Sequence, residues 1–280
     1  MRKISTLIFV TVIFSSFMWG CTGGTMIDKL VSARKTKVPV ERPTKSKPEM
    51  TVEEAYKLQG ELVEKLIRRY DDTVIGYKLS PKTIKDPTNP DKMIPVYGYL
   101  FESMKVPSGT ALKKAAFIDL HLENEVAFII GQDIPPDRIK TPVDLKQYVK
   151  EVVAAIELPE IRYSGSIDDV TGIDLIVDNV VASKIILGES KTTMDIDADL
   201  IKIKMMKDGV VINEGVSTLV EGSPWNSLFW LVKELEKKGQ ALKAGEIIFT
   251  GGIAKFMDGT PGSYEATYDG LGNITLKVEE

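Results

Sequence analysis

Residues 121–130 read HLENEVAFII, an apolar run that carries Glu123 and Glu125 at its centre. The run predicts a buried strand, and carboxylates are seldom buried without a partner. Because successive side chains of a strand point to opposite faces, the two glutamates share a face at ~6.5–7 Å. Carboxylates that close repel each other, and a divalent cation relieves the repulsion. The alternative is a half-exposed strand whose glutamates face water, and the spacing alone leaves both open.

Three further residues bear on this choice. Glu157, within AAIELPEIR, is a candidate third oxygen ligand for Mg²⁺ or Mn²⁺, which are hard cations that prefer oxygen. Lys78, within the strand-like segment VIGYKL, either extends its ammonium to solvent or pairs with buried anions. His121 shares the face of Glu123 by alternation, and is a metal ligand, a general base or a hydrogen-bonded histidine at the strand end.

The rest of the chain from residue 48 predicts an α+β body. Three helices are expected: one from the capping box at Thr51, one from Thr141 through 156, and one between Ser223 and Gly239. Residues 80–93 are polar and contain prolines, which predicts a loop. Asp208-Gly209 and Asp269-Gly270 predict hairpin turns. The strand-like segments are residues 74–79, 94–101, 115–131 and 246–252.

A series of blocks, in order, resembles the hydratase and decarboxylase branch of the fumarylacetoacetate hydrolase superfamily. That branch includes 2-keto-4-pentenoate hydratase, 2-oxohepta-3-ene-1,7-dioate hydratase and 4-oxalocrotonate decarboxylase. The resemblance covers about residues 50–280, and its seven ordered blocks are specific for the superfamily rather than for one reaction. The blocks are GYK (76–78), Gly98 in PVYGYLF, ENEVAFIIG (123–131), AAIELPEIR (154–162), VDN (177–179) with ILG (186–188), EGSPWNSLFWLVKEL (221–235) and LKAGEIIFTGG (242–252).

The resemblance implies a fold, a ligand set and an oligomer. The fold is the mixed β-sandwich or roll of the superfamily, with a smaller N-terminal α/β part. Glu123, Glu125 and Glu157 match the three metal-binding carboxylates of the family, and Lys78 matches its active-site lysine. Family members are oligomers, so a homo-oligomer is expected. Asp178 and Asn179 are further pocket candidates.

The chain departs from the family pattern at three places, while the metal-ligand set is intact. Leu79-Ser80-Pro81 replaces a Gly-Leu-Thr-Ser-like loop, and Val180-Val181 replaces small or hydroxyl residues after Asp-Asn. His121 stands where the family often has a proline or a basic residue. The first two departures lie near the expected substrate pocket, so they put the identity of the substrate in doubt.

The function that the resemblance implies is addition of water to a 2-hydroxy-2,4-dienoate, a small oxo/hydroxy-dienoic acid. The metal acts as a Lewis acid on an enolate-like charge, and Lys78 stabilises or orients the developing anion. Decarboxylation of an oxo-dicarboxylate uses the same enolate stabilisation and is the nearest alternative. Hydrolytic C–C cleavage usually needs a His-Glu pair, and His121 is the single histidine of the chain. A membrane-tethered binding protein without turnover is the alternative from another class.

The N-terminus predicts export. Arg2-Lys3 precede a short apolar run that ends at Gly20, which is typical of a signal peptide over residues 1–20. Cys21, the single cysteine, follows directly, as in bacterial lipoproteins whose thiol is lipidated, although Met18-Trp19 is not the usual pair before it. We therefore expect a membrane-anchored lipoprotein on the periplasmic or cell-surface side. An uncleaved anchor and a secreted form are the alternatives.

Charge divides the chain into a basic and an acidic part. Residues 21–47 are rich in Lys, Arg and Pro and are predicted to be a tether, leaving residues 48–280 as the catalytic domain. Residues 22–47 carry seven basic and two acidic residues, whereas residues 48–280 carry 27 basic and 38 acidic ones. A basic tether suits an anionic membrane surface, or it only keeps a linker solvated. The acidic domain has no basic patch with interleaved aromatics, which argues against nucleic acid as a partner.

Overall fold

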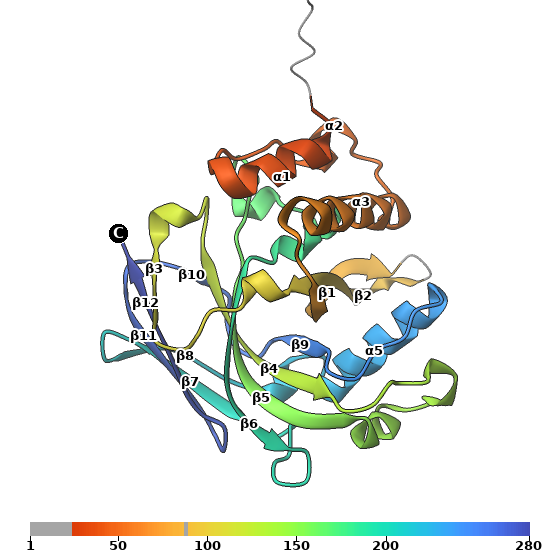
Figure 1. Cartoon of the computed structure of the whole chain (residues 1–280), viewed down its shortest axis with the longest axis vertical. Coiled ribbons are helices and arrows are strands. Elements are labelled where there is room, and N and C mark those ends of the chain that lie inside the picture. Colours follow the sequence, from red (N-terminus) through yellow and green to blue (C-terminus); the bar gives the residue numbers. More distant parts are fainter. Residues whose placement is uncertain (1–23, 87–88) are drawn as a thin grey trace, which may run out of the picture.

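The computed structural model describes residues 24–86 and 89–280 (Figure 1). The α-helices are α1 (Met26–Thr36), α2 (Pro43–Ser46), α3 (Val52–Tyr70), α4 (Gly172–Val177) and α5 (Pro224–Lys237). The strands are β1 (Val74–Asp86), β2 (Asn89–Phe101), β3 (Thr110–Lys113), β4 (His121–Ile130), β5 (Val149–Leu158), β6 (Lys184–Thr192), β7 (Lys202–Lys207), β8 (Val210–Val216), β9 (Ile247–Gly252), β10 (Met257–Asp258), β11 (Gly262–Tyr268) and β12 (Gly272–Glu279). Short 3-10 turns cover 102–104, 114–116, 136–138, 142–147, 167–169, 179–181 and 217–219.

The strands form two mixed sheets, which confirms the predicted α+β class. The larger sheet has the order β2-β1-β9-β4-β5-β6, with β10 added beside β4, and the smaller has the order β3-β12-β11-β7-β8. The pairs β1–β9 and β3–β12 are parallel, and the other pairs are antiparallel. Both sheets and α5 contribute to one core, in which Phe128, Met205, Leu228 and Ile274 are fully buried. This core lies between the concave faces of the two sheets (Figure 1).

A second core covers the opposite face of the larger sheet. There α1, α3 and α4 pack on β1, β2, β4, β5 and β9, and the buried residues include Leu30, Leu62, Ala127, Ile176 and Phe249. Figure 1 shows these helices together on one side of β1 and β2. Strand alternation divides β4 between the two cores: its even-numbered apolar residues face the first, and its odd-numbered positions face the helical side. The glutamates of β4 therefore lie on the side of the helices.

Several local predictions are confirmed because each depends on a short-range pattern. Helix α3 begins with a reciprocal capping box between Thr51 and Glu54. Helix α5 begins at Pro224, with the hydroxyl of Ser223 capping its first turn. Asp208 and Gly209 both have positive φ and join β7 to β8, as a tight hairpin requires.

The helix predicted from Thr141 through 156 is wrong over most of its length. Its capping box with Asp144 exists, but it opens only the 3-10 turn 142–147. Strand β5 then occupies Val149–Leu158, between β4 and β6. A strand covered on both faces is apolar almost throughout, so its valines and isoleucine also match a helical period. Their β-branched side chains favour the extended conformation that the sheet imposes.

The loop predicted over residues 80–93 is also wrong. Strands β1 and β2 extend through most of this segment as a hairpin, with Ile84 paired to Ile94 and Lys85 to Met93. Register shifts between Ser80 and Ile84 accommodate Pro81, because proline donates no ladder hydrogen bond and is confined to edges and bulges. Residues 89–93 of β2 are exposed, which explains the polar composition there, whereas Ile84 is buried in the helical core.

The tether predicted over residues 21–47 is wrong for the part that the structure describes. Helix α1 buries Ile27, Leu30, Val31 and Ala33 against the helical core. Its last turn carries Arg34, whose guanidinium reaches a buried carboxylate of the body. The basic, proline-containing composition of this segment led to the prediction of a tether. The apolar stripe of α1 covers only three turns and is too short to stand out in that composition. The folded domain therefore includes residues 26–36, and Cys21 lies outside the described residues.

Candidate metal and active site

Three carboxylates meet on the helical face of the larger sheet. Glu123 on β4 is paired in register with Glu157 on β5, and Glu125 follows two residues along β4. The sheet register thus places all three on one face within two pleats. One ligand oxygen of each lies within 4.8 Å of the others. We call these three residues the carboxylate cluster.

Two members of the cluster are fully buried and incompletely paired. Glu125 and Glu157 have no exposed surface, while Glu123 is partly exposed. Oε2 of Glu125 accepts a hydrogen bond of 2.7 Å from the amide of Gly251. Oε1 of Glu125 and Oε1 of Glu157 accept none from residues 24–86 or 89–280. Buried polar atoms without partners are rare, and here they converge on one point.

Lys78 brings one positive charge to the cluster. It lies on β1, two strands away from β4, and its fully buried ammonium is 2.7 Å from Oε2 of Glu157. The same Nζ donates to the carbonyl of Val180 at 3.2 Å. Burial acts to lower the pKa of Lys78, but Glu157 and the two other carboxylates outweigh it and raise the pKa. The lysine is therefore held as a buried ammonium.

One ammonium does not balance three carboxylates. Burial, together with the charges of Glu157 and Glu123, holds the pKa of Glu125 well above its ordinary value. Burial also raises the pKa of Glu157 to about 7, even though Lys78 opposes the shift. Both shifts have the same origin, which is an excess of negative charge in a site that water barely reaches. An added cation would remove that excess.

The donor set fits a hard divalent cation. Three carboxylates from adjacent strands supply oxygen ligands on one side, and the partly exposed Glu123 marks the side that remains open. Mg²⁺ and Mn²⁺ accept such a set and keep positions for water or substrate oxygens. Gly252 lies beside Glu123, and a Cβ there would meet its Oε1, so glycine keeps this side clear.

A strained turn supplies the second partner of Lys78. Asn179, Val180 and Val181 all have positive φ, which is costly for β-branched residues and is found where surrounding contacts enforce it. The side chain of Asn179 accepts from the amide of Tyr99 at 2.7 Å and donates to its carbonyl at 2.8 Å. Gly98 allows this approach, because a Cβ there would overlap the carbonyl oxygen of Asn179. Asn179 therefore positions the turn.

His121 is not part of the cluster, although alternation predicts the same face. Its Nε2 is 3.0 Å from Asp119, its Nδ1 is 3.4 Å from Asp258, and its ring stacks on Phe256. Strand β10 pairs with the start of β4 at this point and places Asp258 opposite His121. Of the three roles considered, the structure matches a hydrogen-bonded histidine at the strand end.

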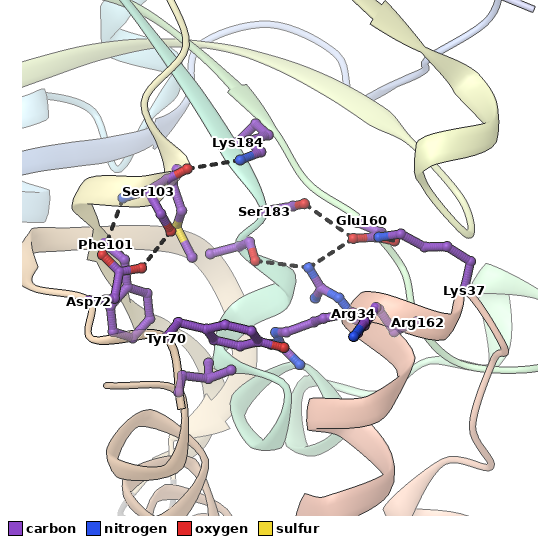
Figure 2. A pocket seen from close by; sticks show the side chains of 14 residues that line it. Arg34, Lys37, Tyr70, Asp72, Phe101, Ser103, Glu160, Arg162, Ser183 and Lys184 are labelled. Carbon is purple, nitrogen blue, oxygen red and sulfur yellow. Dashed lines mark hydrogen bonds and ion pairs between the residues drawn. The ribbon is translucent and has the colours of Figure 1, made fainter. Parts of the chain in front are cut away.

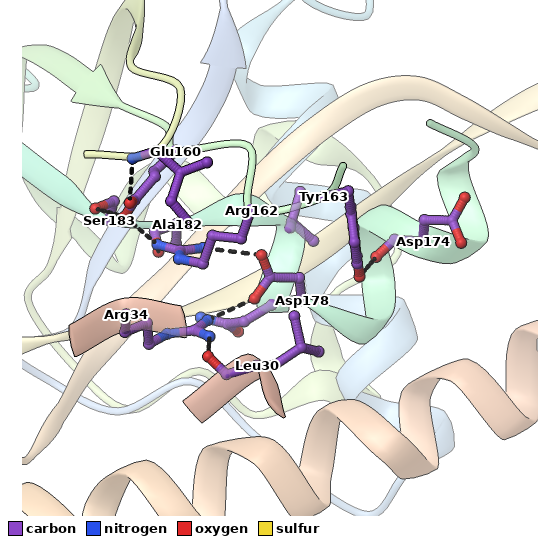
Figure 3. Close-up of polar contacts among 12 residues, drawn as sticks. Leu30, Arg34, Glu160, Arg162, Tyr163, Asp174, Asp178, Ala182 and Ser183 are labelled. Atoms are coloured by element: carbon purple, nitrogen blue, oxygen red, sulfur yellow. Dashed lines mark hydrogen bonds and ion pairs between the residues drawn. The ribbon is translucent and has the colours of Figure 1, made fainter. Parts of the chain in front are cut away.

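Asp178 belongs to a second buried charge cluster, which we call the arginine network (Figure 3). Asp178 accepts from Arg34 at 2.7 Å and from Arg162 at 2.9 Å. Arg162 also bonds the carbonyl of Ala182 at 3.0 Å and lies 3.1 Å from Glu160, which in turn pairs with Lys37 at 3.2 Å. Asp178 is thus an anchor for α1. Sequence reasoning missed Arg34 and Lys37 because they fell in the predicted tether.

Comparison with known proteins covers nearly the whole chain. The chain is 26% identical to 2-hydroxyhexa-2,4-dienoate hydratase of Comamonas testosteroni, over 92% of this chain and 97% of that protein. It is equally similar to 4-oxalocrotonate decarboxylase of Pseudomonas putida, 26% identical over 85% and 89%. No family model matches the chain.

Comparison with solved structures identifies the fold. The structure of 4-oxalocrotonate decarboxylase from Pseudomonas putida G7, complexed with magnesium and adipate, superposes with a TM-score of 0.81 and 22% identity, over 90% of this chain and 95% of that one. Fumarylacetoacetate hydrolase from Exiguobacterium antarcticum superposes with a TM-score of 0.53 and 16% identity, over 74% and 75%. The fold is therefore that of the fumarylacetoacetate hydrolase superfamily. The relatives that are 26% identical in sequence are named as a dienoate hydratase and an oxalocrotonate decarboxylase.

Proposed function

We propose that the protein is a divalent-metal-dependent hydro-lyase that adds water to a 2-hydroxy-2,4-dienoate, a 2-keto-4-pentenoate-like acid. The observation that carries the proposal is the carboxylate cluster with Lys78 against Glu157. This arrangement supplies a cation site and a fixed ammonium in a largely dry setting. Curated relatives named as dienoate and pentenoate hydratases support the same reaction class.

The residues divide the chemistry between them. A cation bound by Glu123, Glu125 and Glu157 would supply Lewis acidity toward a carboxylate and an adjacent oxygen of the substrate. Lys78, fixed by Glu157 and the carbonyl of Val180, offers a preorganised positive charge where the dienol oxygen becomes anionic. Burial strengthens that interaction, because water does not screen it.

Decarboxylation of an oxo-dicarboxylate is the second candidate, since it uses the same stabilised enolate. The observations that favour it are the TM-score of 0.81 to a decarboxylase structure and the 26% identity to 4-oxalocrotonate decarboxylase, which equals the identity to the dienoate hydratase. Hydrolytic C–C cleavage is disfavoured, because His121 is engaged with Asp119 away from the cluster. A silent binding protein is disfavoured by the intact cluster and Lys78.

The assay that tests the proposal uses the purified protein after metal removal. 2-Hydroxypenta-2,4-dienoate and an oxo-dicarboxylate are offered with and without Mg²⁺ or Mn²⁺. We expect metal-dependent loss of the dienoate chromophore and formation of the hydrated 2-oxo acid. Release of CO₂ from the oxo-dicarboxylate alone would select the decarboxylase. No turnover of either substrate with either metal would refute both reactions.

We further propose that the protein is exported and anchored through a lipid on Cys21. The support is the sequence pattern of residues 1–21, together with the exposed lysines of α1, Lys29 and Lys35. Because α1 begins five residues after Cys21, such an anchor holds the domain within ~18 Å of the lipid. No helix in the described part of the chain is long and apolar enough to span a bilayer. Cys21→Ser should move the protein out of the membrane fraction, and retention there would contradict lipidation.

A homo-oligomer is also proposed, on the resemblance to oligomeric family members. Light scattering coupled to size-exclusion chromatography of the detergent-solubilised protein tests it. A mass of two or more chains supports the proposal, and the mass of a single chain across a tenfold concentration range contradicts it.

A further inference from the structure

A pocket of about 360 Å³ lies between α1, the end of α3 and the segments 101–104 and 182–184. Figure 2 shows Lys184 with Ser103 on one side of it and Lys37 with Glu160 on the other. No member of the carboxylate cluster lines this pocket, and neither does Lys78. Its volume corresponds to about a dozen water molecules at ~30 Å³ each, which is room for a small organic ion.

The lining of the pocket is strongly cationic. Two carboxylates, Asp72 and Glu160, face a larger set of cations, which are Arg34, Lys35, Lys37, Arg162 and Lys184. The charge of residues 48–280 has the opposite sign, because acidic residues there outnumber basic ones 38 to 27. A concave surface of one sign focuses the field and concentrates ions of the opposite sign.

Part of this positive charge is balanced within the chain. The arginine network pairs Arg34 and Arg162 with Asp178 (Figure 3). It also pairs Lys37 and Arg162 with Glu160. Arg162 is buried to 1% exposure, and its Nε donates to no atom of the described residues. Asp178 and Glu160 therefore balance three cations with two negative charges, and the Nε of Arg162 remains an unpaired donor among the described residues.

The remaining two cations have no carboxylate partner. Lys184 is half-buried, and its Nζ donates only to the carbonyl of Ser103, at 2.8 Å, among the residues that the structure describes. Burial lowers the pKa of Lys184, and the more distant Asp72 compensates incompletely. Asp72 is itself bonded by the hydroxyl and amide of Ser103. Lys35 is exposed at the rim and forms no ion pair within 24–86 and 89–280.

From this geometry we infer that the pocket is a binding site for a small dianion, a dicarboxylate or a phosphate-bearing compound, separate from the carboxylate cluster. Lys184 and Lys35 supply the two uncompensated charges, and Arg162 supplies a buried donor. Oxyanions match these groups, because ammonium and guanidinium donors form short, charge-assisted bonds to them. The inference goes beyond the proposed function, since it concerns another ligand at another place and does not require turnover.

Calorimetric titration of the full chain tests the inference. The protein is purified in detergent, stripped of divalent metal and dialysed free of chelator, and the probes are inorganic phosphate and succinate. We expect one dianion per chain, with an affinity that falls as NaCl is raised. Lys184→Gln and Lys35→Gln should each weaken binding by roughly three- to tenfold. Lys29→Gln, on the same helix but outside the pocket, is the matched control and should leave the affinity unchanged.

Glu125→Gln distinguishes the two sites. Binding that persists in Glu125→Gln and is weakened in Lys184→Gln supports the inference, whether or not the enzyme turns over dienoates. Loss of binding in Glu125→Gln with no change in Lys184→Gln would place the dianion at the carboxylate cluster and overturn it. Absence of binding for both probes, or equal weakening by Lys29→Gln, would overturn it as well. Lys35 is exposed, so its variant remains informative if Lys184→Gln is poorly folded.

Discussion

The carboxylate cluster and the arginine network are two buried charge clusters on either side of the turn 179–181. In the cluster, three carboxylates share one cation, Lys78. In the network, Arg34, Lys37 and Arg162 share two carboxylates, Asp178 and Glu160. Val180 of the turn contacts Lys78, while Asp178 at its start contacts the arginines. One turn thus connects an anionic site to a cationic one.

The two clusters shift the pKa of buried glutamates in opposite directions. Burial acts to raise the pKa in both, and in Glu157 it prevails, because Glu123 also raises the pKa and Lys78 alone opposes the shift. In Glu160, Arg162, the amide of Ile118 and Lys37 outweigh burial, so its pKa is lowered. Burial alone therefore does not mark a functional carboxylate. A buried carboxylate that has too few cationic partners in the chain does mark a functional site, because a ligand must then balance its charge.

Removing the shared anion of the network should have the largest effect on stability. Asp178→Asn leaves Arg34 and Arg162 buried without their carboxylate, which should cost about 3–5 kcal/mol of unfolding free energy. Urea denaturation measures the change, and Asp169→Asn, at an exposed carboxylate, is the control. A loss below 1 kcal/mol would mean that the network does not hold α1 and the turn.

Removing Lys78, the cation of the carboxylate cluster, should lower catalytic activity. Lys78→Met should lower kcat/KM for the dienoate by about 10²–10³-fold, because the preorganised charge at the developing anion is lost. Glu151→Gln, on the same strand as Glu157 but facing Lys150, should retain activity. Steady-state kinetics with saturating Mn²⁺ distinguishes the two outcomes. Activity of Lys78→Met within threefold of the parent would remove Lys78 from the mechanism.

The pH dependence of stability sharpens the comparison in the metal-free protein. The pKa of Glu157 is raised from 4.5 to about 7 on folding, so between these values the folded state binds more protons than the unfolded chain. Stability should therefore fall as the pH rises from about 5 to 7, by roughly 3 kcal/mol. Urea midpoints measured across this range should show the decline, and Glu157→Gln should flatten it. Stability that rises over the same range would contradict the assignment.

Mn²⁺ should reverse that loss. At a free concentration of about 100 Kd, Mn²⁺ should stabilise the folded protein by about 2.7 kcal/mol, seen as a higher melting temperature. The effect should weaken below pH 7, because binding must displace the proton of Glu157. Glu123→Gln and Glu125→Gln should abolish the Mn²⁺-induced rise in melting temperature. Glu160→Gln should lower the stability of the protein but leave that Mn²⁺-induced rise unchanged. An unchanged shift in Glu125→Gln would exclude the cluster as the metal site.

Much of the site was accessible to sequence reasoning. The alternation of strand side chains placed Glu123 and Glu125 on one face. Glu157 and Lys78 were candidates because they stand in apolar segments, and the ordered blocks matched them to the family's ligand and lysine. The same reasoning made His121 a candidate ligand, but its ring pairs with Asp119 and stacks on Phe256, and it does not join the cluster. Alternation predicts the face of a side chain, but it does not predict which partners that side chain finds there.

The sequence by itself determined the features set by neighbours in the chain: the capped starts of α3 and α5, the Asp208-Gly209 turn and the E-x-E pair. Only the tertiary structure decided that residues 149–158 form a strand and that residues 26–36 form a docked helix. A buried strand and a short amphipathic helix are stabilised by partners distant in sequence, and composition does not name those partners. The roles of buried charges also depend on partners distant in sequence. Glu157 and Glu160 are three residues apart, but Glu157 lies with Glu123, Glu125 and Lys78 and is a candidate metal ligand. Glu160 pairs with Lys37 and Arg162 and is a structural anchor.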